Sequence, residues 1–421
     1  MHPIQNAESA APEAVPAVAT PEPAVTAAVI TAVPETPDPD VGFTMAAEEP
    51  EIAEQARRLV HRIAQELISE PPEGWQQLRA SFAVTVTGHL SRVSFFDGEQ
   101  RRAEVIPSGA VLNLVVEHRA LSATLGDGPW WRLELVLNPA GELTVDHDYG
   151  DEPFPADQLF SPQDYLADLE VYPRATLQVW LAAHIFHGDR QSRPPRLAAV
   201  TARADRESDR LPVVSENDFP NLPMLWSRWT AVSAAFVAVG SERGPRVLPS
   251  CGWFEGSRRS GSSLYLLPGD RAVLSGGVWE ARELATAYRR KTALPDLYRG
   301  APDWVANPVL NTRAAGGLLT FCYWWEHGRW HRGDSPSAPE LTAAVPGIWT
   351  AVTVADVISG LIPGTPTPEQ RSAITSFVAA AERRDVTPAV LAAAFGDTAD
   401  VDTAHYQLTL SGVARIGAHH G

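Results

Sequence analysis

Two cysteines and a pair of histidines are the residues of this 421-residue chain whose types could support nucleophilic or metal chemistry. Cys251 lies in a Pro/Ser/Gly turn, whereas Cys322 lies in an apolar run that precedes His327 and His331. A reactive thiol needs a neighbouring histidine or cation that lowers its pKa, and zinc needs three or four ligands. Histidines four residues apart share a face on a helix, but not across a strand and a turn. We therefore predict structural cysteines, no catalytic residue, no metal site and no cofactor.

The strongest concentration of charge is an acidic stretch from Asp146 to Glu170, which contains no Lys or Arg. Runs of one charge are usually solvated faces, and this is one interpretation of the stretch. Aromatic residues in the same stretch are of the kind that anchors protein interfaces, so a recognition surface for a basic partner is the second interpretation. The binding residues that the second interpretation predicts are Asp146, Asp148, Tyr149, Asp151, Glu152, Phe154, Asp164, Tyr165 and Asp168.

A second group of candidate binding residues combines Trp and Arg in the second half of the chain. Both residue types are enriched at the centres of protein interfaces, and a guanidinium can stack on an indole ring. Large aromatic residues are also mostly buried, so the group could instead form the edge of a core. The group consists of Trp324, Arg329 and Arg332, and an anion-binding pocket would add Trp253, Arg258 and Arg259.

The formal charge of −17 belongs mainly to the first half of the chain, where residues 1–200 hold 29 acidic and 13 basic residues. This acidity argues against nucleic acid or an anionic membrane as the partner. No apolar run is long enough to span a bilayer, and the N-terminus lacks a secretion-signal pattern. One Lys against 33 Arg, with abundant Ala and Pro, indicates a GC-rich bacterial genome, such as an actinobacterial one. A cytoplasmic protein is the simplest expectation.

Two strands and a helix must position the acidic stretch. Apolar residues alternate over 131–137 and again over 143–147, and residues 138–141 supply a turn, so the pattern predicts an antiparallel hairpin. Ser161 and Pro162 are a suitable N-cap and first residue for a following helix. The acidic stretch is therefore expected at the end of the hairpin and along this helix.

The rest of the first half alternates helices and hairpins in the same way. Residues 1–48 are an Ala/Pro-rich mixture without Lys or Arg, a composition that predicts a disordered tail. Helical spacing begins directly after this tail, a second hairpin is expected over 82–96, and further helices are expected over 111–125 and 175–187. Residues 49–187 are therefore predicted to form an acidic α+β domain.

The second half of the chain repeats this order. Residues 188–218 show little periodicity and are interpreted as a linker or a long loop. Residues 219–362 predict a Trp/Arg-rich α+β domain, and the Ala-rich residues 363–421 predict a small helical appendage. The two domains suggest a diverged duplication of one α-β-β-α-β-β-α unit, although alternating hairpins and helices are also simply common.

The order of motifs in the first domain carries a resemblance to a known family. A helix is followed by GWQQLRASFAVTV and SRVSFFD, and a second helix is followed by WWRLELVLNPAGELTVDHDYGDEPF. A Trp ahead of a short hairpin and a Tyr/Asp-rich strand end resemble the YezG-like family of polymorphic-toxin immunity proteins. The resemblance covers residues 50–187 and implies a non-enzymatic protein that binds and neutralises a toxin, often a nuclease.

Three classes of function follow from these patterns. The favoured one is a non-enzymatic protein that neutralises a basic toxin or secreted effector, with the acidic stretch speeding association. The first alternative is an enzyme or anion-binding protein that uses the Trp/Arg pocket of the second half. The second alternative is an adaptor of a secretion system that uses the Ala/Pro-rich tail as a tether.

Overall fold

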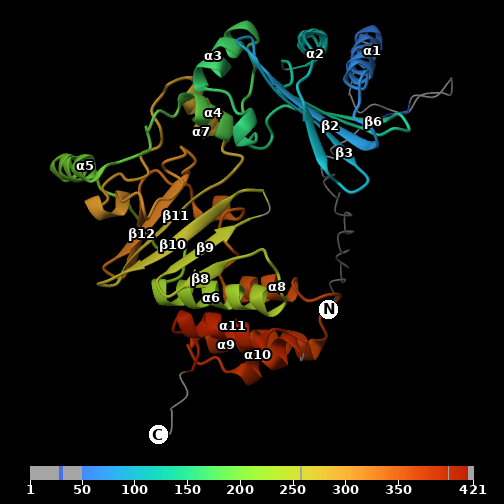
Figure 1. Ribbon diagram of the computed structural model, residues 1–421. Coiled ribbons are helices and arrows are strands. Elements are labelled where there is room, and N and C mark those ends of the chain that lie inside the picture. Colours follow the sequence, from blue (N-terminus) through green and yellow to red (C-terminus); the bar gives the residue numbers. More distant parts are fainter. Residues whose placement is uncertain (1–27, 32–49, 127, 257, 397, 416–421) are drawn as a thin grey trace, which may run out of the picture. The chain divides into compact units, whose positions relative to one another are not determined.

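Figure 1 shows the computed structural model, which describes residues 28–31, 50–126, 128–256, 258–396 and 398–415. Within these residues the chain forms eleven α-helices and two antiparallel sheets, which confirms the predicted α+β class. The chain divides into two compact units. Unit 1 comprises Met1–Val84 and Gly88–Tyr149, and unit 2 comprises Thr85–Thr87 and Gly150–Gly421.

Unit 1 consists of a six-stranded sheet and two helices that cover one of its faces (Figure 1). The strand order is β1-β6-β5-β2-β3-β4, so the hairpin of β5 and β6 lies beside β2, the first strand of the hairpin of β2 and β3. The elements are β1 (Ala28–Thr31), α1 (Pro50–Leu67), β2 (Trp75–Val84), β3 (His89–Asp97), β4 (Arg102–Val105), α2 (Gly109–Ser122), β5 (Arg132–Leu137) and β6 (Glu142–Asp148).

The core of unit 1 forms because alternate strand residues meet the apolar stripes of both helices. Ile63 of α1 and Val115 of α2 pack in one cluster with Phe82 and Leu133 of the sheet, and all four are almost fully buried. Burying a side chain of this size contributes about 1.5–3 kcal/mol. The intervening strand residues face away from this core, so the second face of the sheet is polar and is not covered by α1 or α2.

The predicted hairpin of β5 and β6 is confirmed, and its turn has the expected chemistry. The backbone N–H of Glu142 donates to Oδ1 of Asn138 at 3.0 Å, and Gly141 adopts a φ of 86°. A positive φ is tolerated by glycine because it has no Cβ. The turn therefore fixes the register that places Glu134 opposite Asp146.

The prediction of a disordered tail over residues 1–48 falls mostly outside the described residues. Inside that range the structure describes β1, which pairs antiparallel with β6 and places Ile30 opposite Leu143. This strand was not predicted, because its four residues lie within an Ala/Pro-rich composition that gives no clear period.

Unit 2 contains a seven-stranded sheet with the order β7-β13-β12-β11-β10-β9-β8. Its N-terminal elements are η1 (Ala156–Gln158), α3 (Pro162–Val171), α4 (Val179–Phe186), α5 (Pro195–Glu207), β7 (Val213–Ser215) and α6 (Leu222–Ala238). The central elements are β8 (Arg246–Leu248), β9 (Cys251–Glu255), β10 (Gly261–Leu267), β11 (Arg271–Gly277), α7 (Arg282–Arg289), η2 (Asp303–Ala306), β12 (Phe321–Glu326) and β13 (Arg329–Arg332). The C-terminal elements are η3 (Ala338–Leu341), α8 (Ala351–Ser359), α9 (Pro368–Glu382), α10 (Pro388–Phe395) and α11 (Val401–Leu410).

Helix α6 organises unit 2 because it is apolar on nearly all sides and therefore needs cover on all sides. Figure 1 shows α6 between the sheet and the layer of α9, α10 and α11. Trp229 of α6, Leu264 of the sheet, and Phe377 and Leu408 of the C-terminal helices belong to one buried cluster. The described part of residues 363–421 is therefore helical as expected, but its helices complete the core of unit 2 and do not form an appendage.

The suggested duplication is not supported by the way the strands connect. In unit 1, β5 pairs with β2, so the hairpin of β5 and β6 lies on the side of β2 that is not paired with β3. In unit 2, β12 pairs with β11, and the strands from β8 to β13 follow one another across the sheet. The two units share an order of elements along the chain but have different topologies.

The boundary between the units also differs from the expected linker at residues 188–218. The chain changes unit at Tyr149, and the helix predicted to close the first domain, α4, packs against α7 of unit 2. Val179 and Ala183 contact Leu284 and Tyr288 in this cluster. Residues 188–218 contain α5 and β7, so they are an integral part of unit 2.

Candidate protein-binding surfaces

The acidic stretch is divided between the two units. Asp146, Asp148 and Tyr149 belong to unit 1, and its remaining residues belong to unit 2. Most of the carboxylates have hydrogen-bond or ion-pair partners within their own unit. Because the stretch itself contains no Lys or Arg, the sequence did not predict these partners.

Asp164 and Asp168 of α3 hold the segment Thr85–Thr87. Thr87 Oγ1 donates to Asp164 at 2.7 Å, and the N–H of Val86 donates to Asp168 at 2.9 Å. Asp164 also forms a capping box with Ser161, and hydrogen bonds from Ser161 and Thr87 lower the pKa of its carboxyl group. Asp168 is fully buried. Asp168 is therefore structural and not part of an exposed binding surface as predicted, whereas Asp164 is partly exposed and its carboxylate is used for these contacts.

The aromatic residues Phe154 and Tyr165 are also internal. Only 6% of Phe154 and 1% of Tyr165 is exposed. The Phe154 ring packs edge-to-face on Trp180, with ring centroids 5.0 Å apart, and Tyr165 packs in the same way on His184 at 5.7 Å. They anchor the core of unit 2 and cannot act as exposed interface anchors, so this part of the prediction is wrong.

Three further acids of the stretch also have partners. Asp148 accepts a hydrogen bond from Arg132 at 2.6 Å, and Asp151 accepts one from Gln178 at 3.0 Å. Glu152 pairs with Arg259 at 2.7 Å, although its side chain stays 71% exposed. Exposed pairs of this kind contribute about 0–1 kcal/mol each. Tyr149 keeps 36% of its surface exposed.

The Trp/Arg pocket of the second half does not form. Trp324 is 1% exposed and stacks on His331 with ring centroids 5.9 Å apart, so the expectation that it lines a pocket is wrong. Arg332 pairs with Asp218 at 3.4 Å and is structural, whereas Arg329 is exposed on β13. Trp324 is buried because the segment around η2 covers this face of the sheet.

The two cysteines lack the environment of a nucleophile. Burial raises the pKa of the Cys322 thiol far above its usual value, and burial also raises that of Cys251. A nucleophilic cysteine needs a lowered pKa. Across the described residues, no cluster of three or more His, Cys, Asp or Glu side chains has the geometry to hold a metal ion.

The sheet face of unit 1 that neither α1 nor α2 covers (the uncovered sheet face) is a surface that sequence reasoning did not single out. Arg132 at one end of this face is buried, and the Glu134 side chain is 43% exposed. Glu134 and Asp146 lie directly opposite each other on β5 and β6, and both point away from the core because their neighbours point into it. Arg132 forms ion pairs with Glu134 and Asp148 on the same face. The Asp146 carboxylate forms no side-chain hydrogen bond or ion pair within the described part of the chain. The register of β5 and β6 was predictable, and it would have identified this pair.

A second surface lies on α5, in the segment expected to be a linker. Figure 1 shows α5 at the periphery of unit 2. Leu197 is 50% exposed and Val200 is 67% exposed. Three Arg side chains of the same helix are exposed as well. An amphipathic period with small buried residues, Ala198 and Ala202, was the signal that could have revealed this helix.

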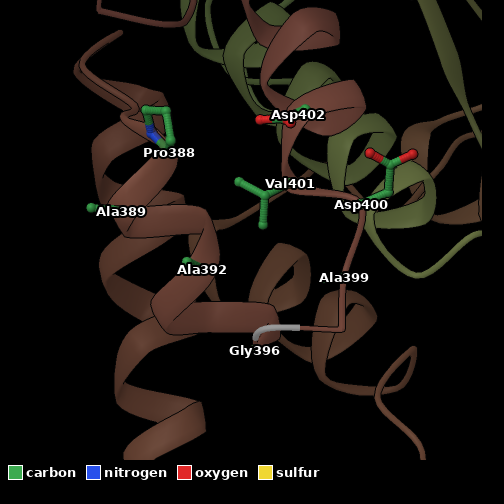
Figure 2. Close-up of a pocket in the computed structure, with 8 residues that line it drawn as sticks. All are labelled: Pro388, Ala389, Ala392, Gly396, Ala399, Asp400, Val401 and Asp402. Carbon is green, nitrogen blue, oxygen red and sulfur yellow. The ribbon is translucent and has the colours of Figure 1, made fainter.

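Figure 2 shows a pocket of about 430 Å³ between α10 and the start of α11. Its wall consists mainly of small side chains such as Ala389, Ala392 and Ala399. Asp400 at its rim accepts a hydrogen bond from the N–H of Thr403 and so caps α11. Asp400 and Asp402 are the charged residues of its lining, and the Asp400 carboxylate is already used for this cap.

No family model and no curated protein matches the chain. None of the helices in the described ranges is long and apolar enough to cross a membrane.

Proposed function

We propose that this chain is a non-enzymatic protein-binding protein of the toxin-neutralising kind, and that the uncovered sheet face of unit 1 docks a basic partner. The observation that carries the proposal is the carboxylate pair of Glu134 and Asp146 on adjacent strands. The resemblance of the first domain to YezG-like immunity proteins supports the same reading. A bacterial, cytoplasmic setting is part of the proposal.

The chemistry of the pair favours a cationic partner. Like charges directly opposite each other on two strands destabilise the pairing by about 0.2–1 kcal/mol. Arg132 offsets this repulsion on the side of Glu134 and Asp148 but forms no ion pair with Asp146. A Lys or Arg side chain of a partner would complete the charge balance at Asp146.

The net charge of residues 50–149 also favours a basic partner. Residues 50–149 contain 14 acidic and 9 basic residues. Such an excess raises the rate at which a basic protein associates, and the effect decreases as salt shortens the screening length to about 8 Å.

The proposal is tested by isolating the partner from native cells by affinity purification and then measuring its association rate with purified variants. Reversing both charges, in Glu134→Lys with Asp146→Lys, should slow association by about tenfold or more and flatten its salt dependence. The matched control is Glu66→Lys with Glu70→Lys, which makes the same change of net charge at exposed positions of α1 and its C-terminal end. Equal effects of both double variants, or a partner without a basic surface, would refute the proposal.

A further inference from the structure

We propose that the exposed face of α5 is a second docking site, and that it binds an acidic amphipathic helix of a partner protein. Unlike the proposed function, this inference concerns unit 2 and a partner segment of negative charge. It rests on the packing of α5, on its exposed apolar residues and on three arginines without ion pairs.

Helix α5 is held in place by few but specific contacts. Ala198 and Ala202 are its buried apolar residues, and Ala198 joins the cluster that covers the second sheet face of unit 2. Asp205 is 2% exposed and accepts a hydrogen bond from the N–H of Gly300 at 2.9 Å. Before and after the helix, Arg193 and Arg210 pair with Asp296 at 2.7 and 2.8 Å. The helix is thus a fixed element that directs its bulky side chains outward.

The outward face alternates apolar and basic groups. Arg196, Val200 and Arg203 are spaced by four and three residues, so they form one row along the helix, and Leu197 lies beside this row. Arg196, Arg203 and Arg206 are exposed and form no ion pair with any described residue. Glu207 is the one exposed acid of the helix. An exposed Leu and an exposed Val beside exposed arginines give this row the composition of an interface, in which Arg is enriched.

Charge complementarity identifies the occupant. Arg196 and Arg203 are two helical turns apart, about 10 Å along the axis. A partner helix with two carboxylates at the same spacing and apolar side chains between them could pair with both guanidinium groups while it covers Leu197 and Val200. Arg suits this role because its planar group can bind a carboxylate through two hydrogen bonds.

The test uses the full chain and two synthetic helical peptides. The first peptide has a Leu stripe flanked by Glu residues two turns apart, and the second has Lys in place of Glu. Fluorescence anisotropy should show saturable binding of the Glu peptide and much weaker binding of the Lys peptide. The triple variant Arg196→Glu, Arg203→Glu, Arg206→Glu should weaken binding of the Glu peptide by about tenfold or more.

The matched control reverses three exposed arginines elsewhere in unit 2, namely Arg243, Arg290 and Arg383. Binding to this control should stay within about twofold of the original chain, because only the net charge changes. Circular dichroism of both triple variants establishes that they remain folded.

Several outcomes would overturn the inference. Failure of the Glu peptide to bind saturably, or equal loss in both triple variants, would remove the site. Displacement of the peptide by a single-stranded oligonucleotide at lower concentration would assign the face to nucleic acid. Self-association of the chain that disappears in the α5 variant, measured by sedimentation velocity, would assign it to a second copy.

Discussion

Helices α3 and α5 belong to the same unit and have similar fractions of charged residues, but they differ in the side chains that they bury and expose. Helix α3 buries Tyr165 and Asp168, and its carboxylates bind neighbouring backbone and hydroxyl groups. Helix α5 buries Ala198, Ala202 and Asp205 and leaves its Leu, its Val and all three of its Arg side chains outside. The comparison shows that a charged helix is embedded or exposed according to the size and partners of its inward residues, and not according to its net charge.

Each helix nevertheless uses one buried aspartate in the same way. Asp168 accepts the N–H of Val86, and Asp205 accepts the N–H of Gly300, each at 2.9 Å. A carboxylate that meets a backbone donor in this way satisfies a group that would otherwise be buried without a partner. The bulky side chains around these aspartates are therefore what distinguishes α3 from α5.

The largest effect is expected from removing the aromatic anchor of α3. Tyr165→Ala should lower the free energy of unfolding by about 3–5 kcal/mol, because it leaves a cavity beside Phe154 and His184. Urea denaturation followed by Trp fluorescence measures this change. A loss below about 1 kcal/mol would mean that α3 is not embedded and would break the comparison.

A smaller loss is expected from the buried carboxylate itself. Asp168→Ala should cost about 1.5–3 kcal/mol, because the N–H of Val86 loses its charged acceptor. Glu170→Ala, two residues further along α3 and exposed, is the control and should change stability by less than about 0.5 kcal/mol. Similar values for the two variants would show that Asp168 is solvated.

The pH dependence of stability sharpens the comparison at the unit 1 end of the acidic stretch. His147 stacks on His118 at 5.3 Å, and Nδ1 of His118 accepts a hydrogen bond from the Trp130 indole. Burial lowers the pKa of His118 to about 3 and that of His147 to about 4. Glu117 and Arg119 flank His118 along the chain, and Asp146 and Asp148 flank His147.

The sign of this effect follows from proton linkage. The unfolded chain binds protons near pH 6.5, whereas the folded chain does not until a lower pH, so acid favours unfolding. Stability should be complete above about pH 6.5 and should decrease below it, down to about pH 4 for His147 and about pH 3 for His118, by up to about 1.4 kcal/mol per histidine and pH unit. Denaturation of His118→Gln should show a flatter pH profile than the original chain. An unchanged profile would place the pair in contact with solvent.

The smallest effect is expected on the outer face of α5. Leu197→Ala and Val200→Ala should each change the free energy of unfolding by less than about 0.5 kcal/mol, because both side chains are at least half exposed. The same two variants should weaken binding of the acidic peptide. A loss of stability above about 1 kcal/mol would show that these residues are covered within the chain.

Elements with a strong period could be predicted from the sequence, and elements held by distant partners could not. The hairpin at residues 131–147 and helix α6 follow from local patterns of apolar residues. The role of Asp168 depends on Val86, which is 82 residues away in sequence, so no local pattern could reveal it. Helix α5 carries a weaker local signal than α6, because the buried apolar residues of its amphipathic period are two alanines.

The binding surface predicted from the acidic stretch was also misplaced, because charges counted along the chain do not show which residues lie opposite one another. Counting charges along the chain identified the acidic stretch but not the strand register that pairs Glu134 with Asp146. The partners of Asp148 and Glu152, Arg132 and Arg259, lie outside the stretch. Charge in a sequence therefore predicts a surface only where the positions of the opposite charges are known as well.

The central claim is that recognition by unit 2 uses α5 and not the aromatic residues of the acidic stretch. Hydroxyl-radical footprinting of the full chain with mass spectrometry tests it most directly, because it compares side-chain exposure in both segments in one experiment. The account predicts strong labelling of Leu197 and Val200 and protection of Phe154 and Tyr165, although aromatic rings are intrinsically the more reactive. Labelling of Tyr165 comparable to that of a free tyrosine, with protection of Val200, would contradict the account.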